Sequence, residues 1–275
     1  MTSPWRALSG SRPGKWSVWK FNWLANHKII RVLERARRHA HGVLLDVGCG
    51  SKAFAPHLQG HVTRYIGVDL MAPAGFDPRT RGPDALGRAE ALPIRDQSVD
   101  TVLGLSMLTY LTDPVRMLEE AHRVLRPGGT LILEFTQMAP LHDPPHDYFR
   151  FTRYGAAHLL ERADFEPIEF LEIGGLWSRA GLTTIAGINR LNRGPTRVLT
   201  EIPARVLYVV LQLGFEGLDR MFFDRDEVLA HLIVARRREA LQPAPTSPGS
   251  SPPPPPGPWS SPLIGPSSSP TRPIA

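Results

Sequence analysis

The stretch VLLDVGCGSK at residues 43–52 decides the fold. Its aliphatic first half predicts a buried strand, which reaches an acid, Asp46, and then enters a turn with glycines at 48 and 50. Glycine lets the backbone turn sharply and pass close to a ligand. A helix is predicted to follow over 51–59. A strand, a glycine turn and a helix in this order are typical of α/β proteins that bind phosphate or nucleotide groups.

Outward from this stretch, short β-branched runs alternate with helical segments, which predicts an α/β domain over residues 41–238. The domain includes an apolar, partly helical insert at 176–228. A stripe from Leu199 to Leu213 in this insert has helical spacing and is predicted to be core or a lid, with membrane contact as the alternative. The predicted strands are 43–47, 64–70, 84–88, 99–105, 130–135, 166–173 and 231–236, and the other predicted helices are 114–125 and 154–163.

The two ends of the chain differ from this body. Residues 1–40 are rich in tryptophan and carry nine Lys or Arg against one acid, Glu34, whereas the rest of the chain is slightly acidic. A helix is predicted within residues 17–40, and its aromatic stripe either packs on the domain or lies on an anionic membrane surface. Residues 239–275 contain thirteen prolines and eight serines, which predicts a disordered tail.

Composition excludes several classes of protein. The single cysteine has no disulfide partner and cannot build a Cys-based zinc site, and no metal site is predicted. No apolar run is long enough to span a membrane and the N-terminal residues lack a secretory signal pattern, so a cytoplasmic location is expected. Because the body of the chain is not basic, no nucleic-acid partner is predicted.

Two aspartates narrow the choice of ligand. Gly48, Gly50 and Ala53 also satisfy the dinucleotide fingerprint G-x-G-x-x-G/A, which is a weak signal alone. Asp69 ends the second predicted strand, where an acid hydrogen-bonds ribose hydroxyls in either kind of site. Asp46 would repel a pyrophosphate but would suit an ammonium group, so it favours a cationic ligand over a nicotinamide cofactor.

Four segments in the same order resemble the class I S-adenosylmethionine-dependent methyltransferases of the broad type 11 group. They are DVGCGS, GVDL, RAEALPIRDQSVDTV and LRPGGTLILEF, and the resemblance covers about residues 40–173. It implies a Rossmann-like, seven-stranded, mostly parallel sheet with helices on both faces and an antiparallel last strand. It also implies S-adenosyl-L-methionine as the cofactor.

The resemblance further implies which residues bind this cofactor. Asp46, Gly48 and Gly50 would line its methionine and ribose end, Asp69 would hold the ribose hydroxyls, and Leu70 would lie beside the adenine. Three more residues would lie near the adenine, namely Ala89, Glu90 and Leu92.

The chain departs from the family pattern at three places. Lys52 replaces the third glycine of the first motif, Arg88 replaces an acid that often precedes the Ala-Glu pair, and Thr109-Tyr110 replaces a frequent Glu-His. GCGSK nevertheless resembles a bacterial subset with GCGxKPY, whose members often accompany genes for glycans or the cell envelope.

The segment after the fifth main strand also resembles that subset. It reads HDPPHDYFRFT from residue 142, and its position borders the crevice where open α/β sheets bind ligands. Histidine can take a proton from an acceptor hydroxyl near neutral pH. We therefore predict His146 as base, with Asp147 orienting it or Tyr148 shaping the pocket. The alternative is that these side chains only hold a loop together.

These features predict methyl transfer from S-adenosylmethionine to a small-molecule, sugar or lipid acceptor, at oxygen. Peripheral membrane contact through the N-terminal segment is a further prediction. The altered residues Lys52, Arg88 and Tyr110 leave open a second hypothesis, a cofactor-binding fold retained as an interaction module. A nicotinamide oxidoreductase is the third.

Overall fold

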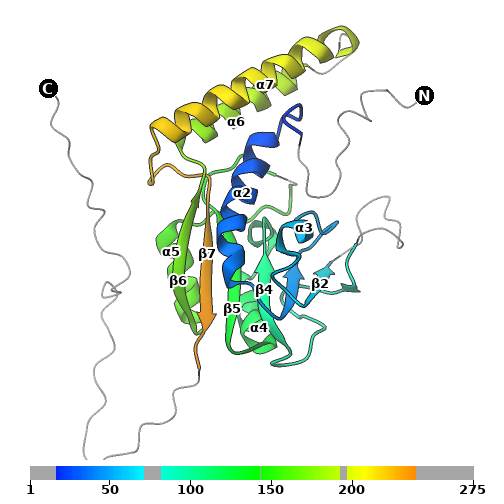
Figure 1. Cartoon of the computed structure of the whole chain (residues 1–275), viewed down its shortest axis with the longest axis vertical. Coiled ribbons are helices and arrows are strands. Elements are labelled where there is room, and N and C mark those ends of the chain that lie inside the picture. Colours follow the sequence, from blue (N-terminus) through cyan, green and yellow to red (C-terminus); the bar gives the residue numbers. More distant parts are fainter. Residues whose placement is uncertain (1–16, 71–81, 143, 193–196, 240–275) are drawn as a thin grey trace, which may run out of the picture. The chain divides into compact units, whose positions relative to one another are not determined.

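A seven-stranded sheet forms the centre of the computed structural model, which describes residues 17–70, 82–142, 144–192 and 197–239 (Figure 1). The strands lie in the order β3-β2-β1-β4-β5-β7-β6. Strand β7 pairs antiparallel with both of its neighbours, and the other pairs are parallel. The bounds are β1 Val43–Val47, β2 Arg64–Asp69, β3 Ala85–Leu86, β4 Val99–Gly104, β5 Leu125–Thr136, β6 Phe165–Ile173 and β7 Ala230–Arg237. The predicted fold class is confirmed.

Helices cover both faces of the sheet because its strands are apolar on both sides. α4 (Pro114–Val124) and α5 (Arg153–Arg162) pack on one face, and α2 (Trp23–Ala36) and α3 (Ala55–Leu58) pack on the other. Short 3₁₀ turns at Arg37–His39 and Leu108–Tyr110 connect elements of the domain. The helix predicted at 51–59 is shorter than expected. Only α3 at Ala55–Leu58 is helical, and residues 51–54 form turns.

The predicted N-terminal helix packs on the domain through its aliphatic residues. Leu24 and Leu33 in α2 are fully buried, and Val32 joins the core on that face of the sheet. The aromatic residues ahead of α2 behave differently, since the side chains of Trp19 and Phe21 are each 46% exposed. Trp16 and the preceding residues lie outside the described part of the chain, as does the predicted disordered tail from residue 240 onward.

The insert between β6 and β7 is a helical hairpin of α6 (Leu176–Leu191) and α7 (Arg197–Met221). Ile185 of α6 packs against Ala204 and Tyr208 of α7. The chain turns into this hairpin at Gly174, which has a φ of +60°. Since β6 runs parallel to β4 and β5, the hairpin leaves the sheet at the edge where the parallel strands end (Figure 1).

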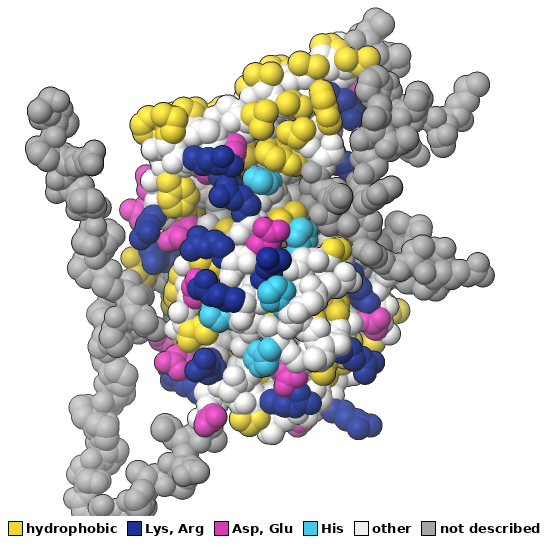
Figure 2. Space-filling view, in the orientation of Figure 1, with side chains coloured by type: hydrophobic (Ala, Val, Ile, Leu, Met, Phe, Trp, Pro, Cys, Tyr) yellow, Lys and Arg dark blue, Asp and Glu magenta, His cyan; other side chains and the backbone are white. Residues whose placement is uncertain are grey.

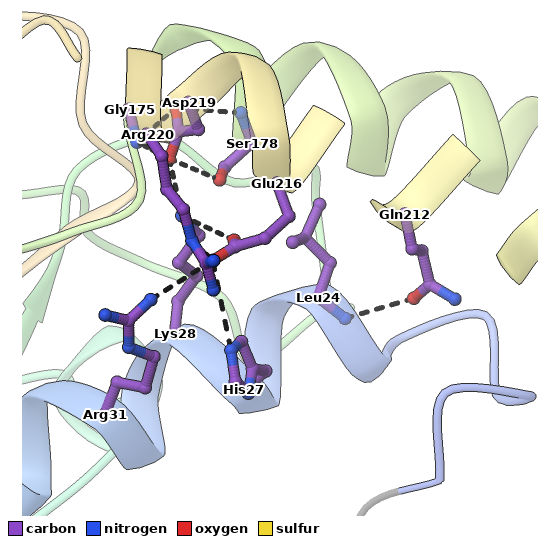
Figure 3. Close-up of polar contacts among 10 residues, drawn as sticks. All are labelled: Leu24, His27, Lys28, Arg31, Gly175, Ser178, Gln212, Glu216, Asp219 and Arg220. Atoms are coloured by element: carbon purple, nitrogen blue, oxygen red, sulfur yellow. Dashed lines mark hydrogen bonds and ion pairs between the residues drawn. The ribbon is translucent and has the colours of Figure 1, made fainter. Parts of the chain in front are cut away.

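A buried polar cluster joins this hairpin to α2 (Figure 3). Lys28 Nζ lies 2.7 Å from carboxylate oxygens of both Glu216 and Asp219. Asp219 also accepts hydrogen bonds from the backbone N–H of Gly175 and from the hydroxyl of Ser178, the latter at 2.7 Å. The polar side of α7 is therefore turned inward against α2 and the start of α6.

None of the helices within the described residues is both long enough and apolar enough to cross a bilayer.

Candidate functional site

The candidate site lies where the strand order reverses. Strands β1 and β4 are neighbours, but the chain continues from β1 toward β2 and from β4 toward β5. The loops that leave the two strands therefore diverge, and in such sheets ligands bind in the crevice outside the carboxyl ends of these strands. Asp46, Gly48 and Gly50 come from β1 and its turn, whereas Ser106 and Met107 follow β4.

The glycine turn after β1 requires its glycines. Gly48 has a φ of +73°, and a Cβ at this position would come within 2.9 Å of the Met107 Cβ. Gly50 has a φ of +49° and no atom within 4 Å of the space that a Cβ would fill. The turn is thus held close to the β4 loop at Gly48 and is open at Gly50.

Lys52 explains why the loss of the third motif glycine is tolerated. It has a φ of +54°, the left-handed conformation that glycine adopts easily and other residues seldom do. Its Nζ lies 2.6 Å from Asp84 Oδ2, and the same carboxylate oxygen accepts a 2.7 Å hydrogen bond from the backbone N–H of Gly67. The side chain therefore ties the turn to the segment before β3 and offsets the strained backbone.

Asp46 lies beneath the turn, only 4% exposed, and accepts a 2.5 Å hydrogen bond from the Tyr65 hydroxyl. Burial raises the pKa of Asp46 to about 7, a net value in which the hydrogen bond from Tyr65 opposes burial and the nearby negative charge of Asp69 adds to it. An ammonium group bound beside Asp46 would favour the ionised carboxylate.

Asp69 links the ends of β1 and β2. Its Oδ2 accepts a 2.8 Å hydrogen bond from the backbone N–H of Gly50. The neighbouring Leu70 is 60% exposed, so it offers an apolar surface beside this carboxylate. One side of the crevice thus combines a carboxylate acceptor with an apolar contact, which suits a ribose and a base.

The remaining predicted adenine residues lie in the segment after β3. Leu92 is buried, and its backbone N–H donates a 2.7 Å hydrogen bond to the Glu120 carboxylate of α4. Ala89 packs against the core, whereas Glu90 is partly exposed and lies 3.7 Å from Arg88. Arg88 therefore pairs with an acid in its own segment.

Sequence reasoning missed Glu134, a buried acid inside the apolar run of β5. Its carboxylate accepts hydrogen bonds from the Ser106 backbone N–H at 2.9 Å and from the Ser106 hydroxyl at 2.7 Å. Burial raises the pKa of Glu134. Ser106 has a φ of +53°, and the next residue, Met107, packs against Gly48. By bonding Ser106, Glu134 therefore fixes the loop that lies beside the glycine turn. The signal available in sequence was a lone acid in LILEF.

The segment after β5 folds back onto the loop after β4. The Tyr148 N–H donates a 2.8 Å hydrogen bond to the Thr109 carbonyl, and the Tyr110 hydroxyl lies 2.5 Å from His142 Nδ1. His146 and Tyr148 are both exposed, and His146 Nδ1 lies 3.2 Å from the Tyr148 hydroxyl. The structure thus brings two of the predicted catalytic residues together.

Asp147 does not contact His146 in the way that the orienting role requires. Its two carboxylate oxygens lie 2.5 and 2.7 Å from the guanidinium of Arg150, and the His142 backbone N–H donates a third hydrogen bond to it. These bonds, led by the one from Arg150, lower the pKa of Asp147 to about 2. Asp147 and Arg150 therefore hold the loop together, and Tyr148 is the neighbour of His146.

Two other sequence features carry no chemistry here. Burial raises the pKa of the Cys49 thiol to about 12, and the charges of Asp46 and Asp69 add to this effect, so the thiol is not activated. Across the parts of the chain that the structure describes, no group of three His, Cys, Asp or Glu side chains is placed to hold a metal ion.

The crevice fits S-adenosylmethionine by the chemistry of its groups. The open side of Gly50 leaves room against the backbone, Asp69 offers a carboxylate to ribose hydroxyls, and Leu70 offers an apolar surface to a base. The carboxylate of Asp46 suits an ammonium group rather than a pyrophosphate. The donor set therefore matches this cofactor better than a dinucleotide.

We expect the affinity for S-adenosylhomocysteine to rise about thirtyfold between pH 5.5 and 8. The free Asp46 carboxyl has a pKa of about 7, so below that pH it must lose a proton before it can pair with the ammonium group. Calorimetric titrations at several pH values measure this dependence. Asp46→Asn should bind more weakly and with a flat profile, and an unchanged profile in that variant would exclude Asp46 as its origin.

Comparisons with known proteins agree on one family. The family model described as "Methyltransferase domain" matches residues 45–133. A Mycolicibacterium smegmatis protein named "Probable S-adenosylmethionine-dependent methyltransferase" is 28% identical over 59% of this chain and 65% of its own length. The malonyl-[acyl-carrier protein] O-methyltransferase of Yersinia pestis is 27% identical over 70% of this chain and 72% of its own length.

Two further likenesses cover smaller shares of the matched proteins. An uncharacterized methyltransferase of Mycobacteroides abscessus is 41% identical over 34% of this chain and 39% of its own length. The solved phosphoethanolamine N-methyltransferase 2 of Haemonchus contortus with S-adenosyl-L-methionine has a TM-score of 0.50 and 15% identity, covering 81% of this chain and 57% of that one. Among these four proteins, this chain covers two thirds or more of the length of the Yersinia pestis relative alone. The likeness to the solved structure shows a shared fold and nothing more.

Proposed function

We propose that this chain, whose residues 45–133 match the methyltransferase model, is a class I S-adenosylmethionine-dependent methyltransferase and that it methylates an oxygen of a small-molecule, sugar or lipid acceptor. The observation that carries the proposal is the glycine turn whose Gly50 N–H is bonded to Asp69 at the carboxyl edge of the sheet. The relative named as an O-methyltransferase supports oxygen as the methylated atom.

S-adenosylmethionine supplies an electrophilic methyl group when bound. The chain's part is to hold this cofactor through Asp46, Gly48, Gly50 and Asp69, and to align an acceptor with it. Methyl transfer is an in-line displacement, so positioning and exclusion of water supply much of the rate. The adenine would contact Leu70 and the segment that contains Ala89, Glu90 and Leu92.

His146 is the proposed base for the acceptor hydroxyl. It is exposed on the loop that follows β5, with the Tyr148 hydroxyl 3.2 Å from its Nδ1. That contact can hold the imidazole so that Nε2 faces the acceptor and takes its proton. Asp147 acts indirectly in this proposal, because its pairing with Arg150 keeps the loop in place.

Titration calorimetry with S-adenosylhomocysteine, with NAD as the comparison ligand, tests the cofactor assignment. Micromolar binding of S-adenosylhomocysteine alone is expected. Binding of NAD that Asp69→Ala abolishes would instead support an oxidoreductase. If neither ligand binds, an interaction module becomes the better explanation, and the two ends of the chain become the parts to study.

His146→Ala is expected to lower turnover at least a hundredfold and to leave the affinity for S-adenosylhomocysteine unchanged, because only the proton transfer is lost. Turnover is measured as S-adenosylhomocysteine released from S-adenosylmethionine, with lipid extracts and sugar glycosides supplied as acceptors. His142→Ala is the matched control within the same loop, and it should retain most activity. Equal losses of turnover and cofactor affinity in His146→Ala would assign this residue a structural role.

We place the protein in the cytoplasm, with peripheral contact between residues 1–40 and an anionic membrane surface. The excess of basic residues in this segment and the exposed side chains of Trp19 and Phe21 support this contact. An acceptor from the cell envelope, a glycan or a lipid, would be reached from such a position. No nucleic-acid partner is proposed.

A further inference from the structure

Helix α7 is inverted relative to an ordinary surface helix, because its apolar side faces outward. Its exposed residues between 202 and 219 include no charged side chain. Figure 2 shows hydrophobic side chains gathered over α6 and α7, with few charges among them. The outward line consists of Ile202, Val206, Val210, Leu213 and Met221, which are 55, 49, 61, 52 and 72% exposed. For this line, the prediction that the insert's stripe is core is wrong.

The inward side of α7 fixes this orientation. Gln212, Glu216 and Asp219 recur at steps of four and three residues, so they share one side of the helix, and all three are buried. Gln212 accepts a 3.0 Å hydrogen bond from the Leu24 N–H, and the two acids pair with Lys28 (Figure 3). Rotation of α7 to bury its apolar line would break every one of these contacts.

Two exposed arginines, Arg31 and Arg220, lie where α2 meets α7 and favour an anionic partner. Between residues 176 and 200 the sequence contains four arginines and no acid. In the second half of α7 the acids are Glu216 and Asp219, which lie inside against Lys28. Arg31 and Arg220 remain 52 and 61% exposed at their side chains where α2 meets α7. Counted to residue 227, the hairpin and the loop after it carry seven arginines against six acids, so the exposed basic charge beside the face comes from Arg31 and Arg220 and not from the hairpin as a whole.

We propose that the outward face of α7, defined as Ile202, Val206, Val210, Leu213 and Met221, seats on an anionic lipid bilayer. An amphipathic helix of this kind lies in the plane of the membrane, with its apolar side among the acyl chains and its basic residues at the headgroups. The 25-residue helix is about 37 Å long at 1.5 Å per residue, enough for a continuous contact. Trp19 and Phe21 add two exposed aromatic side chains in the segment before α2.

The place of the hairpin in the fold connects this surface to the site. The hairpin leaves the sheet after β6, at the same edge as the glycine turn after β1 and the Ser106 loop after β4. A protein held to a bilayer by α7 has this edge tethered near the headgroups. This inference rests on the proposed function, and within the proposed acceptors it selects one that is carried by the membrane.

The test is vesicle flotation of the full chain and of the double variant Val206→Glu/Val210→Glu. Wild-type protein should float with vesicles that contain phosphatidylglycerol and should float much less with pure phosphatidylcholine. The double variant should lose at least tenfold in partition coefficient. Ile168→Glu is the control, because it makes one substitution of the same kind at a 39% exposed aliphatic residue of β6, away from α7, and it should float like wild type.

Folding and cofactor binding are measured alongside. Both variants should keep the wild-type circular dichroism and the wild-type affinity for S-adenosylhomocysteine. If the double variant does not fold, Val210→Cys provides a second route, because iodoacetate can add the negative charge after folding while Cys49 stays buried. Alkylation should then release the protein from the vesicles.

Several results would overturn the membrane surface. One is wild-type protein that fails to float, or that floats equally with neutral vesicles. Another is a double variant that floats like wild type. A third is a wild-type dimer, without lipid, that the double variant dissociates, because α7 would then face a second copy. Loss of S-adenosylhomocysteine binding by wild type would refute the proposed function alone, because flotation does not depend on it.

Discussion

Asp219→Ala is expected to lower the free energy of unfolding by about 3 kcal/mol, because it removes one of the two carboxylates that pair with the buried Lys28 and leaves buried donors without an acceptor. Asp219 is 1% exposed and accepts hydrogen bonds from Lys28, Gly175 and Ser178. Removal of the carboxylate leaves the ammonium group of Lys28 with Glu216 alone and leaves the Gly175 N–H unsatisfied. Urea denaturation followed by circular dichroism measures the loss.

The matched control is Glu119→Ala, which removes an acid from an ion pair with Arg116 on the surface of α4. Both side chains of that pair are more than half exposed, so a change of about 0–1 kcal/mol is expected. A loss below about 1 kcal/mol for Asp219→Ala itself would contradict the view that the polar cluster holds α7 in place.

The same cluster predicts how stability depends on pH. Burial works against ionisation of Asp219, but hydrogen bonds from Lys28, Gly175 and Ser178 outweigh it and lower its pKa below 3.8. Stability that depends on the ionised form is therefore complete above the unfolded pKa and is lost as the pH falls through the folded pKa. Wild type should lose stability below about pH 4, and Asp219→Ala should lose less over that range.

Asp69→Ala is expected to weaken the binding of S-adenosylhomocysteine at least a hundredfold. A carboxylate that accepts two ribose hydroxyls contributes about 3 kcal/mol, since each hydrogen bond to a charged group is worth about 1.5–3 kcal/mol. The change also removes the acceptor for the Gly50 N–H, so the glycine turn loses a constraint. Titration calorimetry measures the affinity.

Asp96→Ala serves as the control for this result. Asp96 is also an aspartate paired with a neighbouring group, Arg123, but its side chain is 72% exposed and it lies before β4, away from the carboxyl edge. The Asp96→Ala variant should bind S-adenosylhomocysteine with the affinity of wild type. If Asp69→Ala and Asp96→Ala bind equally well, Asp69 does not hold the ribose.

The strand-forming parts of the sequence were predictable because their patterns are local. The apolar run at 43–47 and the alternation at 166–173 each matched an observed strand to within one residue. Strand β5 extends further toward its N-terminus than predicted, because Leu125 pairs with Val99 ahead of the proline-glycine turn. That pairing depends on a distant strand, which no local pattern reports.

The candidate site was predictable in its backbone and less so in its side chains. The glycine turn and Asp69 follow from spacing, since strand ends fix their positions. The partners of Asp46 and Asp147, namely Tyr65 and Arg150, depend on which side chains meet in space. The outward face of α7 could not be predicted either, because helical spacing shows that a stripe exists and not which way it points.

The position of β7 sets the order in which the sheet can form. Strand β6 pairs with β7 and not with β5, so it has no hydrogen-bonded neighbour until residues 230–237 have been synthesised. The strands β2, β4 and β5 can pair as the chain emerges, because each finds a neighbour already made. A chain that stops before residue 230 therefore presents five paired strands with an unpaired edge at β5, and such an edge pairs readily with other chains. Completion of the last strand is thus the step that protects this protein from aggregation during its own synthesis.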